Sequence, residues 1–208
     1  MKTLLTENIK RNPEDRLYNL PCPIIGLTGG IATGKSTVSE KLSSEGFAVI
    51  CADALVKEVY KSEATISHIK KYYPQVFTKE SIDFKKLREL FFSDNNIQKD
   101  IEGLIYSQMP SAFIAAFHAL KDPDVVIYDV PLLFEKGLHK LVDVKATVYC
   151  SQQEQVKRLI KRDSISEELA NNIISKQMPI EEKRNSSDIV IDNSKEEADL
   201  ASFLSLFK

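Results

Sequence analysis

A glycine-rich segment near the N-terminal end of the chain has the residue types and spacing of a phosphate-binding loop. It matches the pattern G-x-x-x-x-G-K-[ST] in full, and a short apolar run precedes it while a helical pattern follows it. Glycines let successive backbone N–H groups point at one polyphosphate, and a helix that begins at Lys35 adds its positive dipole end. The predicted nucleotide-binding residues of this loop are Gly29, Gly30, Ile31, Ala32, Thr33, Gly34, Lys35, Ser36 and Thr37.

Three side chains indicate chemistry at the bound phosphates. In such loops the lysine, here Lys35, bridges the β- and γ-phosphates, and the hydroxyl of Ser36 holds Mg²⁺. Asp129 ends the apolar run V-V-I-Y-D, which resembles a Walker B site that binds Mg²⁺ through water. The alternative is that Asp129 only caps a loop, because four hydrophobic residues followed by aspartate are a common pattern. We predict Ser36 and Asp129 as the metal ligands.

Asp53 is the candidate catalytic base. A phosphate loop alone does not separate kinases from GTPases and motor ATPases, but the guanine-binding sequence N-K-x-D is absent from the chain. Asp53 follows a predicted strand at the sheet edge where ligands bind, and a carboxylate there can orient an acceptor hydroxyl and take its proton. The alternative is that Asp53 only caps the helix that follows, since aspartate is a favoured N-cap residue.

A basic segment from Gln155 to Arg184 is predicted to form a lid. Most basic faces of this kind are merely solvated, and five acidic residues dilute this one. In a phosphate-loop kinase, however, a mobile segment after the fourth strand can close over ATP and bring an arginine to the transferring phosphoryl group. Arg162 is the candidate for that arginine.

The remaining sequence indicates an α/β fold that positions these residues. Short apolar β-type runs alternate with helical segments, which is typical of a parallel sheet covered on both faces. Ser151 with Glu154, and Ser194 with Glu197, have the capping-box spacing that opens a helix. We expect a P-loop NTPase-type parallel five-stranded sheet with helices on both faces, an inserted helical substrate lobe and a lid, with strands at residues 23–27, 47–51, 125–128, 146–150 and 189–191.

The stretch between the second and third strands is far too long for a simple crossover. Its helical periodicity, as in Phe84, Leu87, Leu90 and Phe91, predicts an inserted helical lobe that binds the acceptor. The aromatic pairs 72–73 and 91–92 are interpreted first as core of this lobe. The predicted organisation is an N-terminal extension at 1–22, a nucleotide-binding core at 23–57, 123–154 and 185–208, an acceptor lobe at 58–122 and a lid at 155–184.

Composition excludes several classes of protein. The chain has 208 residues, with 28 basic and 30 acidic side chains and a net charge of -2, so no overall field attracts nucleic acid or an anionic membrane. No apolar stretch is long enough to span a bilayer, and the N-terminal residues resemble neither a secretory signal nor a transit peptide. Cys22, Cys51 and Cys150 lack metal-ligand spacing and fit reduced thiols. We expect a cytoplasmic monomer that binds neither nucleic acid nor membrane.

Taken together, these segments resemble the dephospho-CoA kinase family over residues 24–193. The resemblance rests on GLTGGIATGKSTV, CADALVKEV, YDVPLLFEKGL, QQEQVKRLIKRD and KQMPIEEKRNSSDIVIDN, in that order. It implies transfer of the γ-phosphoryl group of ATP to the ribose 3′-hydroxyl of dephospho-CoA, with Mg²⁺, as the last step of CoA synthesis. It also implies that Asp53 lies beside the acceptor hydroxyl, that Arg162 is the lid arginine, and that Asn193 lies near the adenine.

The sequence departs from the family pattern at two places. Cys51, Ala52 and Asp53 stand where the family usually has Asp-Ala-Asp, which removes only the earlier acid. Tyr106 and Ser107 stand where His-Pro is common, which affects the expected contacts to dephospho-CoA rather than the type of reaction.

Two other functions compete with this one. Another small-molecule kinase, of the nucleoside, shikimate or gluconate type, would share the core and the chemistry and differ in its acceptor. A non-catalytic regulator that uses ATP occupancy as a switch would need no catalytic acid, so a substitution at Asp53 separates it from an enzyme.

Overall fold

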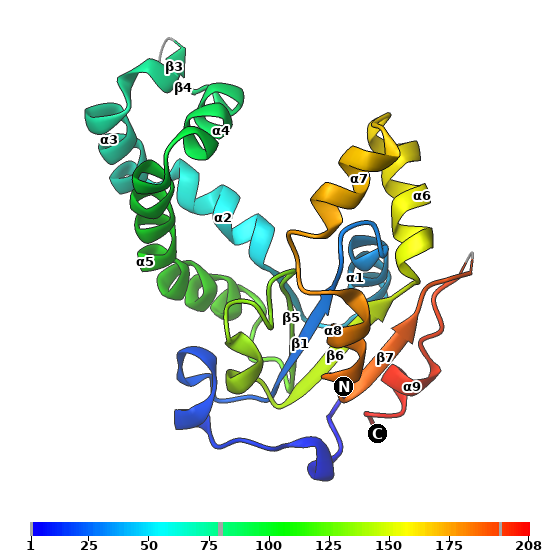
Figure 1. Ribbon diagram of the computed structural model, residues 1–208. Helices are drawn as coiled ribbons and strands as arrows, with labels where there is room; N and C mark the ends of the chain where they lie inside the picture. The colour runs from blue at the N-terminus through cyan, green and yellow to red at the C-terminus, as the bar shows by residue number, and fades with distance from the viewer. Residues whose placement is uncertain (1, 79–80, 196) are drawn as a thin grey trace. The chain divides into compact units, whose positions relative to one another are not determined.

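The structure, a computed structural model, describes residues 2–78, 81–195 and 197–208. The chain divides into two compact units. One comprises the chain up to Ala52 together with Leu120–Lys208, and the other comprises Asp53–Ala119. Figure 1 shows the sheet of the first unit and the helices of the second.

All five predicted strands are present, in one parallel sheet with the order β2-β5-β1-β6-β7. Their ends differ from the prediction by at most two residues. The first strand continues past Leu27, because Thr28 and Gly29 still pair with Thr147 and Val148 of the neighbouring strand. The strands are β1 (Ile24–Gly29), β2 (Val49–Cys51), β5 (Val126–Asp129), β6 (Val144–Tyr149) and β7 (Ile189–Asp192).

Helices cover both faces of this sheet, as predicted. Alternate strand residues such as Ile25 and Leu27 are buried in one cluster with Val38 and Leu42 of α1 (Lys35–Ser44) and Phe203 of α9 (Ala201–Leu204). On the opposite face the Thr147 hydroxyl hydrogen-bonds that of Ser187 (2.6 Å), just after α8 (Ile180–Asn185). Figure 1 shows α8 lying in front of the sheet. Burial on both faces explains why the strands are almost entirely apolar.

Two helices follow β6 and form a small cluster of their own. The α6 helix (Gln152–Asp163) begins at the predicted Ser151, whose hydroxyl accepts the N–H of Glu154. It packs against α7 (Glu167–Ile174) through Val156, Leu159 and Ala170. Ile31 and Ala32 of the phosphate loop pack against the same cluster. The segment predicted as a lid therefore includes α7 and most of α6 and α8.

The prediction of a C-terminal helix opening at Ser194 was wrong. The α9 helix covers only Ala201–Leu204. Ser194 instead donates its N–H to the side chain of Asp192 (2.8 Å), and Asp199 donates its N–H to the Asp192 carbonyl (2.8 Å). These bonds turn the chain at the end of β7, so that a helix forms only beyond Asp199, whose carboxylate accepts the N–H of Ala201 (3.0 Å).

The second unit is helical, apart from one short hairpin. Ser62 caps α3 by accepting the N–H of Thr65, and the Gln108 side chain joins both residues to the longest helix (2.7 Å each). The periodic segment from Phe84 forms a helix as predicted, but Tyr72 and Phe92 are 54% and 68% exposed rather than core residues. Both residues lie in the last turn of their helices, where the side chains are not covered by a neighbouring helix. The elements are α2 (Ala52–Lys61), α3 (Glu63–Tyr72), β3 (Phe77–Thr78), β4 (Ser81–Ile82), α4 (Phe84–Ser93) and α5 (Asn95–Ala119).

Asp143 binds the N-terminal extension to the rest of the first unit through hydrogen bonds. This buried carboxylate accepts hydrogen bonds from the N–H groups of Lys10, Arg11 and Ile24 and from the Arg16 guanidinium, at 2.9–3.0 Å. The Arg16 and Asp143 side chains are 4% and 0% exposed. Four 3-10 turns complete the unit, at Thr6–Asn8, Pro13–Asp15, Leu17–Asn19 and Leu138–Leu141. No helix among the described residues is both long and apolar enough to span a bilayer.

Candidate active site

The phosphate loop joins the end of β1 to the start of α1 and offers a set of open backbone donors. Ala32 and Gly34 have positive φ angles of 60° and 87°, which turn the backbone between Gly29 and Lys35. Within the described part of the chain, the N–H groups of Ala32, Gly34, Lys35, Ser36 and Thr37 have no hydrogen-bond acceptor. Open N–H groups at a helix N-terminus are a ready anion site, so the loop can bind a polyphosphate as the sequence predicts.

The loop glycines are required by close neighbours. A Cβ at Gly29 would lie 2.6 Å from the Thr33 hydroxyl oxygen and 3.0 Å from the Val148 carbonyl oxygen. A Cβ at Gly34 would lie 2.1 Å from Nδ2 of Asn193 and would also be strained by the left-handed backbone. A bulkier residue at either position would therefore clash with these atoms.

Lys35 and Asp129 are brought together at the carboxyl edge of the sheet. Asp129 is the last residue of β5 and aligns with Leu27 of β1 and Cys51 of β2. Its carboxylate forms an ion pair with the Lys35 ammonium, and the two side chains are 3% and 10% exposed. Both predicted residues are therefore within reach of the same phosphate-binding loop.

Ser36 and Thr37 lie in the first turn of α1 with exposed side chains. Ser36 directly follows Lys35, so its hydroxyl lies at the helix end that faces an anion bound in the loop. No group of three or more histidine, cysteine, aspartate or glutamate residues in the described ranges is arranged to hold a metal ion.

Asn193 contacts the phosphate loop directly. Its side-chain Nδ2 donates to the Thr33 carbonyl (2.8 Å), and its own carbonyl accepts from Arg158 (2.9 Å). Arg158 also pairs with Glu154 (2.9 Å). The structure thus attaches Asn193 to the phosphate loop, whereas its place near the adenine stays a prediction.

Arg158, not Arg162, is the arginine that lies at the loop. Arg162 is exposed and forms a two-point ion pair with the adjacent Asp163 (2.7 and 2.9 Å), which raises the pKa of the guanidinium. Arg158 lies one helical turn closer to the N-terminus of α6, which starts at the carboxyl edge of the sheet. That position in the helix is the signal that could have identified Arg158 from the sequence.

Lys183 is a buried cation, although the sequence alone indicated a solvated lysine of the basic segment. Its ammonium donates to the carbonyls of Gly29 (3.3 Å) and Pro131 (2.8 Å) and pairs with Glu135 (2.8 Å), and its side chain is 0% exposed. Burial lowers its pKa, Glu135 opposes that shift, and the nearby charge of Lys35 adds to it. The available signal was Ile180, three residues earlier on the same buried helix face.

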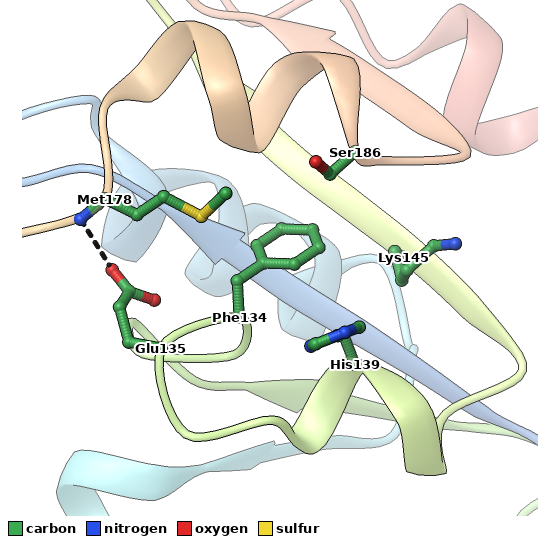
Figure 2. A pocket seen from close by; sticks show the side chains of 6 residues that line it. All are labelled: Phe134, Glu135, His139, Lys145, Met178 and Ser186. Carbon is green, nitrogen blue, oxygen red and sulfur yellow. Dashed lines mark hydrogen bonds between the residues drawn. The ribbon is translucent and has the colours of Figure 1, made fainter.

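Glu135 also fixes the segment that follows α7. It accepts the N–H of Met178 (3.1 Å), the bond drawn in Figure 2. Beside this bond lies an open cavity of about 350 Å³, in which the Phe134 ring stacks near His139 with centroids 5.2 Å apart. The lining residues are Phe134, Glu135, His139, Lys145, Met178 and Ser186.

Asp53 lies in the first turn of α2, two residues after the carboxyl end of β2. Its side chain is exposed and, within the described ranges, makes no hydrogen bond or ion pair. It is the second residue of the helix rather than its N-cap, so the capping alternative was wrong. Its carboxylate is therefore free of a local structural role.

Comparison with known proteins shows the family of the chain. A sequence model described as dephospho-CoA kinase matches residues 23–199. Proteins named dephospho-CoA kinase from Fusobacterium nucleatum and Parasynechococcus marenigrum are each 38% identical to this chain. The first alignment covers 85% of this chain and 92% of the relative, and the second covers 82% and 87%.

A solved structure shows the same fold. The crystal structure of TT1252 from Thermus thermophilus superposes with a TM-score of 0.76 at 29% identity, covering 89% of this chain and 93% of that one. Sequence match, fold and phosphate loop agree, and the chain belongs to the dephospho-CoA kinase family.

Proposed function

We propose that this chain transfers the γ-phosphoryl group of ATP to the 3′-hydroxyl of the ribose of dephospho-CoA, giving CoA and ADP. A bond forms between the 3′-oxygen and the γ-phosphorus, the bond from that phosphorus to the β–γ bridging oxygen breaks, and the hydroxyl proton is released. The observation that supports this best is the open phosphate loop in a chain of this family.

The loop and Lys35 would act on the triphosphate. Five N–H groups without an acceptor among the described residues, those of Ala32 and of the four residues 34–37, can bind phosphate oxygens without prior rearrangement of the backbone. Lys35 must leave Asp129 to bridge the β- and γ-phosphates, and Lys183 holds the start of the loop through the Gly29 carbonyl. Fixed donors of this kind stabilise the charge on the transferring group.

Ser36 and Asp129 fit a magnesium site. The hydroxyl of Ser36 is exposed at the helix end, and the Asp129 carboxylate supplies a hard oxygen ligand next to Lys35. Mg²⁺ is usually held by one or two such oxygens together with substrate phosphates and water, so a dedicated cluster of acids is not needed. When bound, the ion would neutralise phosphate charge.

Asp53 would orient the acceptor hydroxyl and take its proton. Its support is the exposed carboxylate in the first turn after β2 and the failure of the capping alternative. Because proton removal is late in a loose phosphoryl transfer, the carboxylate would act mainly by orienting the hydroxyl. A base of this kind contributes about 10²- to 10⁴-fold to the rate.

The segment 155–184 would close over ATP and exclude water. Its α6 and α7 helices already contact the loop through Ile31 and Ala32, and Arg158 already binds the Thr33 and Asn193 carbonyls. Arg162 would have to exchange Asp163 for the phosphoryl group. Closure of such a segment limits wasteful hydrolysis of ATP.

We propose that the reaction takes place in the cytoplasm. Cys22, Cys51 and Cys150 are free thiols, which fits the reducing cytoplasm. Near-neutral net charge fits a protein that acts on a small molecule rather than on nucleic acid, and we propose a monomer.

A coupled ADP-release assay with a panel of acceptors tests the function. With ATP, Mg²⁺ and dephospho-CoA the enzyme should release ADP. With a nucleoside, shikimate or gluconate as the acceptor, ADP release should not exceed the background rate. Lys35→Ala serves as the inactive control and should lose phosphate binding in calorimetry with ADP and ATP. Turnover of another acceptor but not of dephospho-CoA would overturn the assignment.

A further inference from the structure

One N–H group of the phosphate loop already has a side-chain acceptor within the chain. Ile31 donates its N–H to the side-chain oxygen Oε1 of Gln177 at 2.9 Å. Ala32, Gly34 and the first three residues of α1 have no such acceptor in the described part of the chain. A carboxamide oxygen is the same kind of hydrogen-bond acceptor as a phosphate oxygen, so Gln177 takes a position that the triphosphate could use.

Gln177 is held firmly at this place. It lies in the turn between α7 and α8, where its own N–H donates to the Ile174 carbonyl (3.1 Å). The next residue, Met178, is bonded to Glu135 (3.1 Å). The backbone on both sides of the side chain is therefore fixed, and only the carboxamide has to move for the N–H of Ile31 to become free.

A second glutamine orients the adjacent peptide group. Gln155 of α6 donates Nε2 to the Ile31 carbonyl (2.6 Å) and is 1% exposed, with its Oε1 buried and without a partner in the described chain. In a trans peptide the C=O and N–H groups point in opposite directions, so this bond aims the Ala32 N–H away from Gln155. A Cβ at Gly30 would lie 2.3 Å from Nε2 of Gln155, which explains the glycine there.

The two glutamines have different consequences for a ligand. Gln155 holds a carbonyl that a phosphate would not bind, and its contact can persist in the loaded enzyme. Gln177 holds an N–H donor, and a phosphate oxygen can take that donor only if the carboxamide leaves. The contact with Gln177 stabilises the empty loop alone, so it opposes nucleotide binding by its full net free energy.

We propose that the Gln177 carboxamide is a placeholder for a phosphate oxygen at Ile31 and that its displacement by the triphosphate sets nucleotide affinity. The proposal rests on the kinase function proposed above, in that the displacing ligand is the triphosphate of ATP. Displacement also frees the turn after α7 from the loop. Gln177 is thus a residue of the nucleotide site that acts through competition rather than through direct attraction.

The test measures binding of tripolyphosphate, which reports on the loop without the adenine. Gln177→Ala should bind it more tightly than the unaltered protein, by about two- to tenfold, because removing one net hydrogen bond from the empty state favours the loaded state. Gln177→Asn, which is one methylene shorter, should also bind more tightly. Gln153→Ala, an exposed glutamine on α6, is the matched control and should not change the affinity.

Hydrogen exchange provides an independent readout. The Ile31 amide should be protected in the empty protein, lose protection in empty Gln177→Ala, and regain it when tripolyphosphate is bound. Unchanged or weaker tripolyphosphate binding by both Gln177 variants, with unchanged melting temperature, would overturn the proposal. Failure of the proposed function is separate, because it would appear as an absence of ADP release with dephospho-CoA in the unaltered protein.

Discussion

Lys35 of the phosphate loop forms a nearly buried ion pair with Asp129 at the end of β5. The Asp129 carboxylate therefore neutralises the charge of Lys35, the lysine that would bridge the β- and γ-phosphates. Nucleotide binding has to transfer this ammonium from a carboxylate to a phosphate, which leaves the Asp129 carboxylate available to a metal ion.

Asp129→Asn separates these two roles. The amide keeps the shape but cannot neutralise Lys35 or bind a cation well, so metal-free pyrophosphate should bind at least as tightly as it does to the unaltered protein. Turnover with Mg²⁺ and ATP should fall at least about a hundredfold, since metal-assisted charge neutralisation is lost. Calorimetry and the ADP-release assay measure the two effects. Full turnover in the variant would exclude the metal role.

Asp53→Asn should lower turnover and leave nucleotide binding intact. The side chain makes no local hydrogen bond in the described structure, so the fold should be unaffected. We expect kcat to fall about 10²- to 10⁴-fold with an unchanged Kd for ATP. Glu58→Gln on the same helix is the matched control for loss of one exposed acid. A kcat equal to that of the control would refute the role of Asp53.

Arg158→Ala and Arg162→Ala should have different effects. Arg158 supports Thr33 and Asn193 at the loop, so its loss should weaken ATP binding and raise the KM for ATP. Within the described residues Arg162 pairs with Asp163 and makes no hydrogen bond to the loop, so its loss should lower kcat and leave the Kd for ATP unchanged. Steady-state kinetics with calorimetry separates the two patterns. The reverse assignment of effects would place Arg158 at the transferring phosphoryl group.

Asp143→Ala should destabilise the protein without touching the site. The variant leaves the buried Arg16 cation and three backbone N–H groups without their acceptor. Loss of one partner of a buried pair costs about 3–5 kcal/mol, which urea unfolding can measure. Glu58→Ala removes an exposed partner of Lys61 and should change stability little. Equal effects of the two variants would show that the extension is not held by Asp143.

Lys183 should contribute a pH dependence to stability. Burial lowers its pKa below the ordinary value of 10.5, so the unfolded chain binds more protons than the folded one between the two pKa values. The contribution of Lys183 to the free energy of unfolding should therefore rise with pH over that interval. The difference in urea stability between the unaltered protein and Lys183→Met, measured from pH 7 to 10.5, isolates this group. A difference that falls with pH would contradict it.

The order of elements and the loop were predictable because both depend on local patterns. Glycine spacing defines the loop between Gly29 and Lys35, and apolar runs define the strands, because parallel strands buried on both faces must be apolar. Asp129 was predictable for the same reason, since it ends such a run. The failed capping box at Ser194 shows the limit, because the Asp192 side chain competed for the Ser194 N–H.

The partners of polar side chains were not predictable. Lys183, Gln155 and Gln177 lie more than a hundred residues from the loop that they bind, and their local sequence does not indicate that this loop is their partner. Arg162 was preferred over Arg158 because it stands beside Asp163 at the end of the predicted helix, a local feature that does not indicate which arginine contacts the loop. Long-range hydrogen bonds depend on tertiary packing, which composition and periodicity do not encode.

The two ends of the described chain are joined to each other. Leu5 donates its N–H to the Leu206 carbonyl (2.9 Å), and Lys208 donates to the Thr3 carbonyl (3.1 Å). During synthesis, residues 3–5 therefore lack these partners until residues 206–208 have left the ribosome. This pairing can form only after the nucleotide loop, which lies much earlier in the chain than residue 206, has already been able to fold.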